Sequence, residues 1–168
     1  MSTNDQVTLM VSGASGVTPD AEAFRAALTA VCTDLAVQLQ ADAEGASHDI
    51  DIQVVGAATE EDAVEVGRSV ARNNLFKAAI FGNDPNWGRV LAAIGTTSAS
   101  FDPYEVDVSF NGVRLCSAGA PDRPREEVDL TPRSTSVLID LKAGTASATI
   151  YTNDLTHDYV HENSAYSS

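Results

Sequence analysis

The stretch from Phe81 to Gly95 constrains the fold of this chain more than any other. A run of apolar residues typical of a strand, Leu75–Phe81, leads into it. Asp84 is then placed as a helix N-cap and Pro85 as the first helical residue. Four apolar residues follow at helical spacing: Trp87, Val90, Leu91 and Ile94. The sequence therefore predicts a strand, a tight polar corner and a buried helix that ends at Gly95.

This corner has a structural and a functional interpretation. In the structural one, Trp87 fills the core and Arg89 is exposed or paired. In the functional one, Asp84, Asn86 and Arg89 place charge at a helix N-terminus, where anions bind readily. The residues alone favour the structural interpretation, and nothing else in the sequence gives the corner a catalytic role.

Four motifs of the chain resemble the ornithine acetyltransferases, the bifunctional arginine-biosynthesis proteins, and occur in the same order. They are Ser2–Asp5 (Ser-Thr-Asn-Asp), Ala43–Ala46 (Ala-Glu-Gly-Ala), Gly82–Arg89 (Gly-x-Asp-Pro-Asn-Trp-Gly-Arg) and the C-terminal Glu162–Ser168. The resemblance runs through the whole chain but covers only the C-terminal part of the family's length.

Composition limits the classes of function. The 168 residues carry a formal net charge of −14, which disfavours general nucleic-acid binding because phosphates would be repelled. Cys32 and Cys116 are only two cysteines, far apart in sequence, and do not indicate a disulfide framework. The sequence opens with no basic and apolar leader, and no apolar run reaches membrane-spanning length. We therefore expect a soluble, cytoplasmic protein.

Periodicity predicts helices interleaved with strands, followed by hairpins. Strands are expected near residues 7–11, 50–55, 75–81, 104–110, 113–115, 137–141 and 146–150, and helices near 19–43, 60–74, 84–94 and 155–162. Asn111-Gly112 is a strong hairpin signal, which would pair Phe110 with Val113 and Val108 with Leu115. The pattern is typical of an α+β fold.

The resemblance refines this fold. It implies a partial αββα sandwich of the N-terminal-nucleophile type, to which residues 1–46 contribute the remainder of the catalytic domain. Residues 47–168 would form a C-terminal α+β domain, and the final tail would return to the active site. Members of the family cleave themselves into two chains, so an N-terminal partner chain, as in an αβ heterotetramer, is expected.

Glu44 is the first candidate site residue. A carboxylate at the C-terminal end of a helix meets the negative end of the dipole, so Glu44 is either an ordinary exposed residue or a carboxylate aimed at a cationic amine. The resemblance implies the second role, contact with the amino-acid substrate. The family usually continues Gly-Ala-Thr-Lys, whereas this chain has Gly-Ala-Ser-His. Ser47 keeps the hydroxyl of the threonine, and His48 replaces the fixed positive charge of the lysine with a titratable one.

The tail supplies the other candidates. By resemblance, Asn163 and Ser168 bind substrate, and an amide and a hydroxyl suit recognition of a carboxylate or amide. His157 and His161 are four residues apart and would share a helix face, but no third strong ligand accompanies them. We expect neither a metal site nor a bound cofactor.

The nucleophile of the family is missing. In the family, a threonine exposed by self-cleavage accepts the acetyl group, and a Thr-Gly pair on the first chain forms the oxyanion hole. Neither occurs here, and Ser2 matches an interior position of the family rather than the nucleophile. We therefore expect no catalytic residue in this chain, which would be a fragment, a truncated gene product or half of a split enzyme.

The resemblance implies a complete enzyme that moves acetyl from N-acetylornithine to glutamate. Some members also use acetyl-CoA, and the sequence leaves open whether this one would. Two other classes stay open: a non-catalytic remnant that acts as an interaction or ligand-binding module, and an amidase-like relative. Agreement of the motifs through the C-terminus disfavours the amidase.

Overall fold

The computed structural model describes residues 6–165 of the chain. The chain divides into two compact units, one ending at Leu35 and the other beginning at Ala36. No helix within residues 6–165 is both long and apolar enough to cross a membrane. The domain boundary predicted after residue 46, between the end of the catalytic sandwich and a C-terminal α+β domain, stays a prediction.

The N-terminal unit contains an extended segment and most of helix α1 (Ala21–Ala41). Asp20 begins this helix by accepting a hydrogen bond from the Ala23 N–H at 2.8 Å, which confirms the long helix predicted here. The strand predicted at residues 7–11 is wrong, since no ladder pairs with this segment among the residues described. A strand needs a neighbour for its backbone N–H and C=O groups. Large apolar side chains of this unit are exposed: Val7, Leu9, Met10, Val11, Val17, Phe24, Val31 and Leu35.

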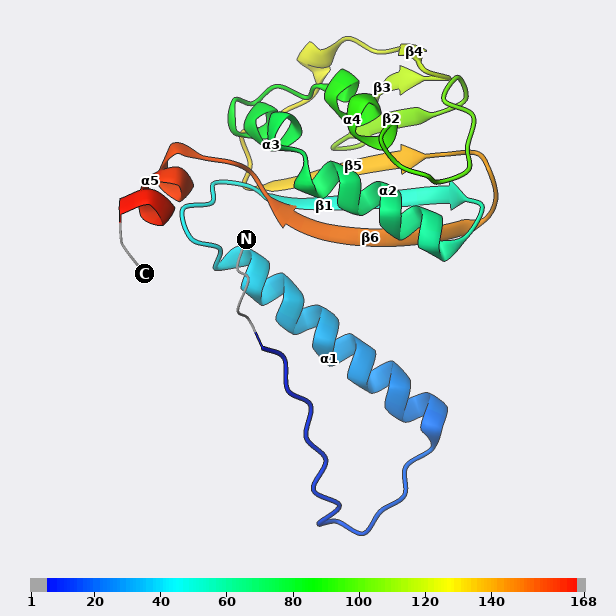
Figure 1. The fold of residues 1–168 in the computed structure, drawn as a ribbon, viewed down its shortest axis with the longest axis vertical. Coiled ribbons are helices and arrows are strands. Elements are labelled where there is room, and N and C mark those ends of the chain that lie inside the picture. The colour runs from blue at the N-terminus through cyan, green and yellow to red at the C-terminus, as the bar shows by residue number, and fades with distance from the viewer. Residues whose placement is uncertain (1–5, 166–168) are drawn as a thin grey trace. The chain divides into compact units, whose positions relative to one another are not determined.

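The second unit is built on one six-stranded sheet (Figure 1). Its strands are β1 (Asp49–Ala57), β2 (Asp107–Phe110), β3 (Val113–Ser117), β4 (Ala120–Pro121), β5 (Ser134–Asp140) and β6 (Ala146–Asn153). Their spatial order is β4-β3-β2-β5-β1-β6, in which β1 and β5 are parallel and every other pair is antiparallel.

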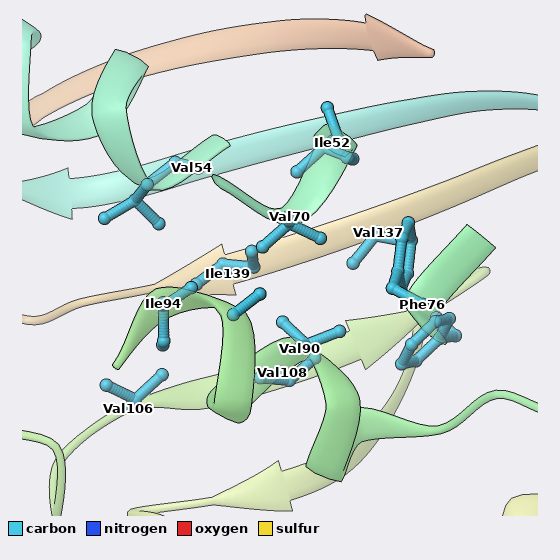
Figure 2. Packing of buried hydrophobic residues seen from close by; sticks show 14 of the residues in the cluster. Ile52, Val54, Val70, Phe76, Val90, Ile94, Val106, Val108, Val137 and Ile139 are labelled. Carbon is cyan, nitrogen blue, oxygen red and sulfur yellow. The ribbon is translucent and has the colours of Figure 1, made fainter. Parts of the chain in front are cut away.

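Three helices, α2 (Glu60–Arg72), α3 (Asn74–Phe81) and α4 (Trp87–Ile94), lie over one face of this sheet (Figure 1). A 3₁₀ turn, η1 (Arg125–Glu127), and a last helix, α5 (His157–Ala165), complete the unit. The core forms between sheet and helices, where Figure 2 shows the side chains facing one another: Ile52, Val54, Val70, Phe76, Val90, Ile94, Val106, Val108, Val137 and Ile139. The predicted α+β class is confirmed.

The strand predicted at Leu75–Phe81 is wrong, because this segment is helix α3. Asn73 caps the helix by accepting from the Phe76 N–H at 2.9 Å, and Phe76 and Ile80 reach the core four residues apart. A short apolar run fits a strand or a buried helix equally well, so periodicity could not decide. Helix α4 also begins later than predicted, at Trp87, because Asn86 rather than Asp84 is its N-cap.

The predicted hairpin is present but its register shifts. Asn111 and Gly112 both have positive φ (+46° and +81°), as the tight turn requires, and Phe110 pairs with Val113 as predicted. Val108, however, pairs with Cys116 instead of Leu115, because a bulge inserts one residue into the ladder. The bulge allows Leu115 and Cys116 both to be buried.

Candidate functional site

Glu44 lies on the turn that connects α1 to β1. The turn is closed by a hydrogen bond from the Ala46 N–H to the Ala43 carbonyl at 3.1 Å. Gly45 has φ +68°, and a Cβ at this position would lie 2.5 Å from the backbone nitrogen of Tyr159 in α5. The turn therefore packs directly on α5, while the Glu44 side chain remains exposed.

Arg133 and Asn153 hold the end of α1 that leads into this turn. Arg133 donates to the carbonyls of Ala41 and Ala46 at 2.8 and 3.2 Å and forms two hydrogen bonds with Asp49 at 2.9 and 3.0 Å. The Asn153 amide donates to the Gln40 carbonyl at 3.0 Å. Carbonyls at a helix C-terminus lack hydrogen-bond donors within the helix, and the Arg133 and Asn153 side chains supply these donors.

Asp154 ties the same turn to the segment that enters α5. Its carboxylate accepts from the backbone N–H groups of Ser47 and His48, each at 3.0 Å, and from the Ser47 hydroxyl. The His48 ring lies 2.8 Å from the carboxylate at Nδ1 and 2.8 Å from the Leu130 carbonyl at Nε2. Burial by itself would raise the pKa of Asp154, but hydrogen bonds from Ser47 and His48 outweigh it, so this pKa lies below its usual range.

Thr156 also joins the turn of Glu44 to α5. Its hydroxyl donates to the Gly45 carbonyl at 2.5 Å and accepts from the Tyr159 N–H at 2.9 Å, so it caps α5 while holding the turn. Asn163 lies one helical turn further on, where its amide donates to the Tyr159 carbonyl at 2.8 Å. A ring contact between Phe81 and His157, with centroids 5.4 Å apart, packs the start of α5 on α3.

The turn of Glu44 rests on α5, the helix that carries Asn163, so two of the three predicted site residues lie on elements that are in contact. Their roles in substrate binding stay predictions. Ser168 lies outside the described residues. Sequence reasoning missed the residues that build the corner: Arg133, Asn153, Asp154 and Thr156. Only Thr156, three residues before Tyr159, carried a local signal, that of a helix cap.

The polar corner of residues 83–89 has a structural role. The Asn86 side chain caps α4 and donates to Asp84 at 3.0 Å, and Arg89 donates to the Leu75 carbonyl at 2.5 Å. Within residues 6–165, no group of three or more His, Cys, Asp or Glu side chains, including any around His157 and His161, is placed to hold a metal ion.

Comparison with known proteins identifies the family. A profile of the ArgJ family matches residues 1–168. The chain is 63% identical to the arginine biosynthesis bifunctional protein ArgJ of Streptomyces avermitilis over 168 residues, which are 100% of this chain and 44% of that protein. The corresponding protein of Mycobacterium leprae is 48% identical over 99% of this chain and 41% of its own length.

A solved structure agrees with the sequence comparisons. The crystal structure of the arginine biosynthesis bifunctional protein argJ from Bacillus halodurans superposes with a TM-score of 0.88 at 32% identity, covering 99% of this chain and 83% of that one. The chain thus spans less than half the length of the curated relatives it matches. From end to end, it belongs to the ArgJ family.

Proposed function

We propose that this chain is the C-terminal part of an acetyltransferase of arginine biosynthesis, which moves acetyl from N-acetylornithine to glutamate. The observation that carries the proposal is the corner where the Glu44 turn is clamped to α5, in a chain that matches the ArgJ family throughout. An exposed carboxylate can bind the ammonium group of an amino acid, and the Asn163 amide on α5 can bind a carboxylate or amide.

The proposed division of labour assigns substrate binding to this chain and acetyl transfer to an N-terminal partner. Glu44, Asn163 and Ser168 bind the amino-acid substrate, whereas the nucleophile and the oxyanion donors lie outside this sequence. The coverage of the relatives supports this arrangement, since the chain spans 44% of the Streptomyces avermitilis protein but 83% of the polypeptide in the Bacillus halodurans crystal. A separate polypeptide of about this extent is what an αβ assembly would contain. Such a biosynthetic enzyme would work in the cytoplasm.

The first test changes Glu44 in the complete protein, meaning this chain together with the N-terminal part that its curated relatives carry. We expect Glu44→Gln to raise the KM for N-acetylornithine roughly tenfold or more, because loss of a charge-assisted bond to a substrate ammonium costs about 1.5–3 kcal/mol. The fold should be unaffected, since Glu44 is exposed.

Glu126→Gln is the matched control, because Glu126 is another exposed glutamate, on η1. It should leave both KM values unchanged. Equal KM values for wild-type protein and Glu44→Gln would remove Glu44 from the site. A complete protein that binds N-acetylornithine without any turnover would instead support the non-catalytic binding module.

A further inference from the structure

We propose that Asp154 and His48 are positioning residues: a buried pair between the Asp154 carboxylate and a doubly protonated His48 holds the Glu44 turn against α5. The charge state of His48 follows from this chain's own contacts. The effect on substrate affinity rests on the function proposed above.

The hydrogen-bond partners of His48 determine its protonation. Nε2 lies 2.8 Å from the Leu130 carbonyl, which can only accept, so Nε2 carries a proton. Nδ1 lies 2.8 Å from the Asp154 carboxylate, which also accepts. The Ser47 hydroxyl lies 3.1 Å from Nδ1, but its single proton is donated to the same carboxylate oxygen, so at Nδ1 the hydroxyl can only accept. Both ring nitrogens therefore donate, and His48 is an imidazolium.

Because Asp154 is buried, its negative charge needs a cation in direct contact. The side chains of His48 and Asp154 are 8% and 0% exposed, and an ionised carboxylate without a close cation would be costly at such a place. Two other cations face Asp154 at longer range. Lys77 on α3 and Arg133 before β5 both feel its negative charge, although neither lies within ion-pair distance of it among the residues described. His48 is thus the cation in direct contact.

The pair acts on the site through the backbone. Asp154 binds the N–H groups of residues 47 and 48, just after the Glu44 turn, and lies two residues before Thr156, the cap of α5. Among residues 6–165 the Glu44 side chain forms no hydrogen bond or ion pair, so its position depends on the backbone of the turn. Losing the charge of Asp154 would loosen the turn relative to Asn163.

The protonation of His48 can be measured without any activity. We expect ¹⁵N NMR of the histidine-labelled 168-residue chain to show protons on both ring nitrogens of His48, as the two acceptors at Nδ1 and Nε2 require. His48→Gln assigns the signal. A single proton on Nε2 with an unprotonated Nδ1 would mean that Ser47 donates to the ring, and this result would overturn the proposal.

The positioning role is tested by kinetics of the complete protein. We expect Asp154→Asn to raise the KM for N-acetylornithine roughly tenfold with a smaller change in kcat, because binding geometry rather than chemistry is disturbed. His48→Lys keeps a cation beside Asp154 and should retain more of the affinity than His48→Gln.

Asp107→Asn is the matched control. Asp107 also accepts several hydrogen bonds, from Ala118, Lys142 and Arg114, but belongs to β2, on the other side of β5 and β1 from β6. It should lower the melting temperature without changing KM. If Asp107→Asn and Asp154→Asn raise KM by the same amount for the same loss of stability, the pair of Asp154 and His48 is only structural. Absence of all acetyl transfer in the wild-type complete protein would count against the proposed function, and the NMR result would remain independent of it.

Discussion

At Gly45 the backbone is left-handed, and the neighbouring helix leaves no room for a side chain. We expect Gly45→Ala to destabilise the second unit by about 2–4 kcal/mol, since it adds a clash with the Tyr159 backbone to the left-handed strain of roughly 1–2 kcal/mol. Gly112→Ala is the matched control, because its φ is +81° but nothing lies within 4 Å. Chemical denaturation of both variants should show the larger loss for Gly45→Ala, and equal losses would contradict the close packing.

Two aspartates of the second unit should respond to pH in opposite directions. The pKa of Asp51 is raised, chiefly by burial and also by the charge of Asp49, while a hydrogen bond from Gln40 partly offsets this. Asp51 therefore stabilises the fold below its ordinary value of 3.8, and this contribution is lost as pH rises through the raised pKa. The lowered pKa of Asp154 has the reverse effect, with stability present above 3.8 and lost as pH falls through the folded-state value.

Melting temperatures measured across pH test whether Asp51 and Asp154 affect stability in opposite directions. Asp51→Asn should raise the melting temperature at pH 7, and the gain should fade towards about pH 3 as the wild-type carboxyl becomes protonated. Asp154→Asn should lower it at pH 7, with the loss shrinking in acid. A constant shift across the pH range for either variant would show that ionisation is not the cause.

Among the elements, α2 shows a sequence signal that works locally. The sequence Thr59-Glu60-Glu61-Asp62 resembles a capping box, and the Thr59 hydroxyl accepts from the Asp62 N–H at 3.1 Å. We expect Thr59→Ala to cost about 1 kcal/mol of unfolding free energy, and Thr59→Ser to cost little because it retains the hydroxyl. Denaturant titration of the two variants provides the comparison, and equal stability would show that the cap contributes nothing.

For the whole molecule, the decisive question is whether this chain accepts an acetyl group. We expect intact mass measurement after incubation with N-acetylornithine to show no added acetyl group on the chain alone, because the proposed function assigns the acyl-accepting threonine and the oxyanion donors to the N-terminal part. The same incubation with the N-terminal part present should produce turnover. An acetyl adduct on the isolated chain would overturn this division and return Ser2 to consideration.

The sequence by itself determined the local features of this protein. Some features depend only on residues that are close in sequence, so they could be predicted directly. They are the helix cap at Thr59, the turn at Asn111-Gly112 and the helical spacing of Val66 and Val70. The family also followed from sequence, because its motifs are contiguous strings. Glu44 and Asn163 came from those motifs rather than from any local rule, and their substrate contacts stay predictions.

Tertiary structure alone decided what depends on distant partners. Residues 7–11 form no ladder and residues 75–81 form a helix because pairing and packing, not periodicity, choose between the alternatives. Strand β6 pairs with β1 rather than with β5, which precedes it in sequence. Asp154 meets His48 across more than 100 residues, so no window of sequence could show that this carboxylate would hold the Glu44 turn.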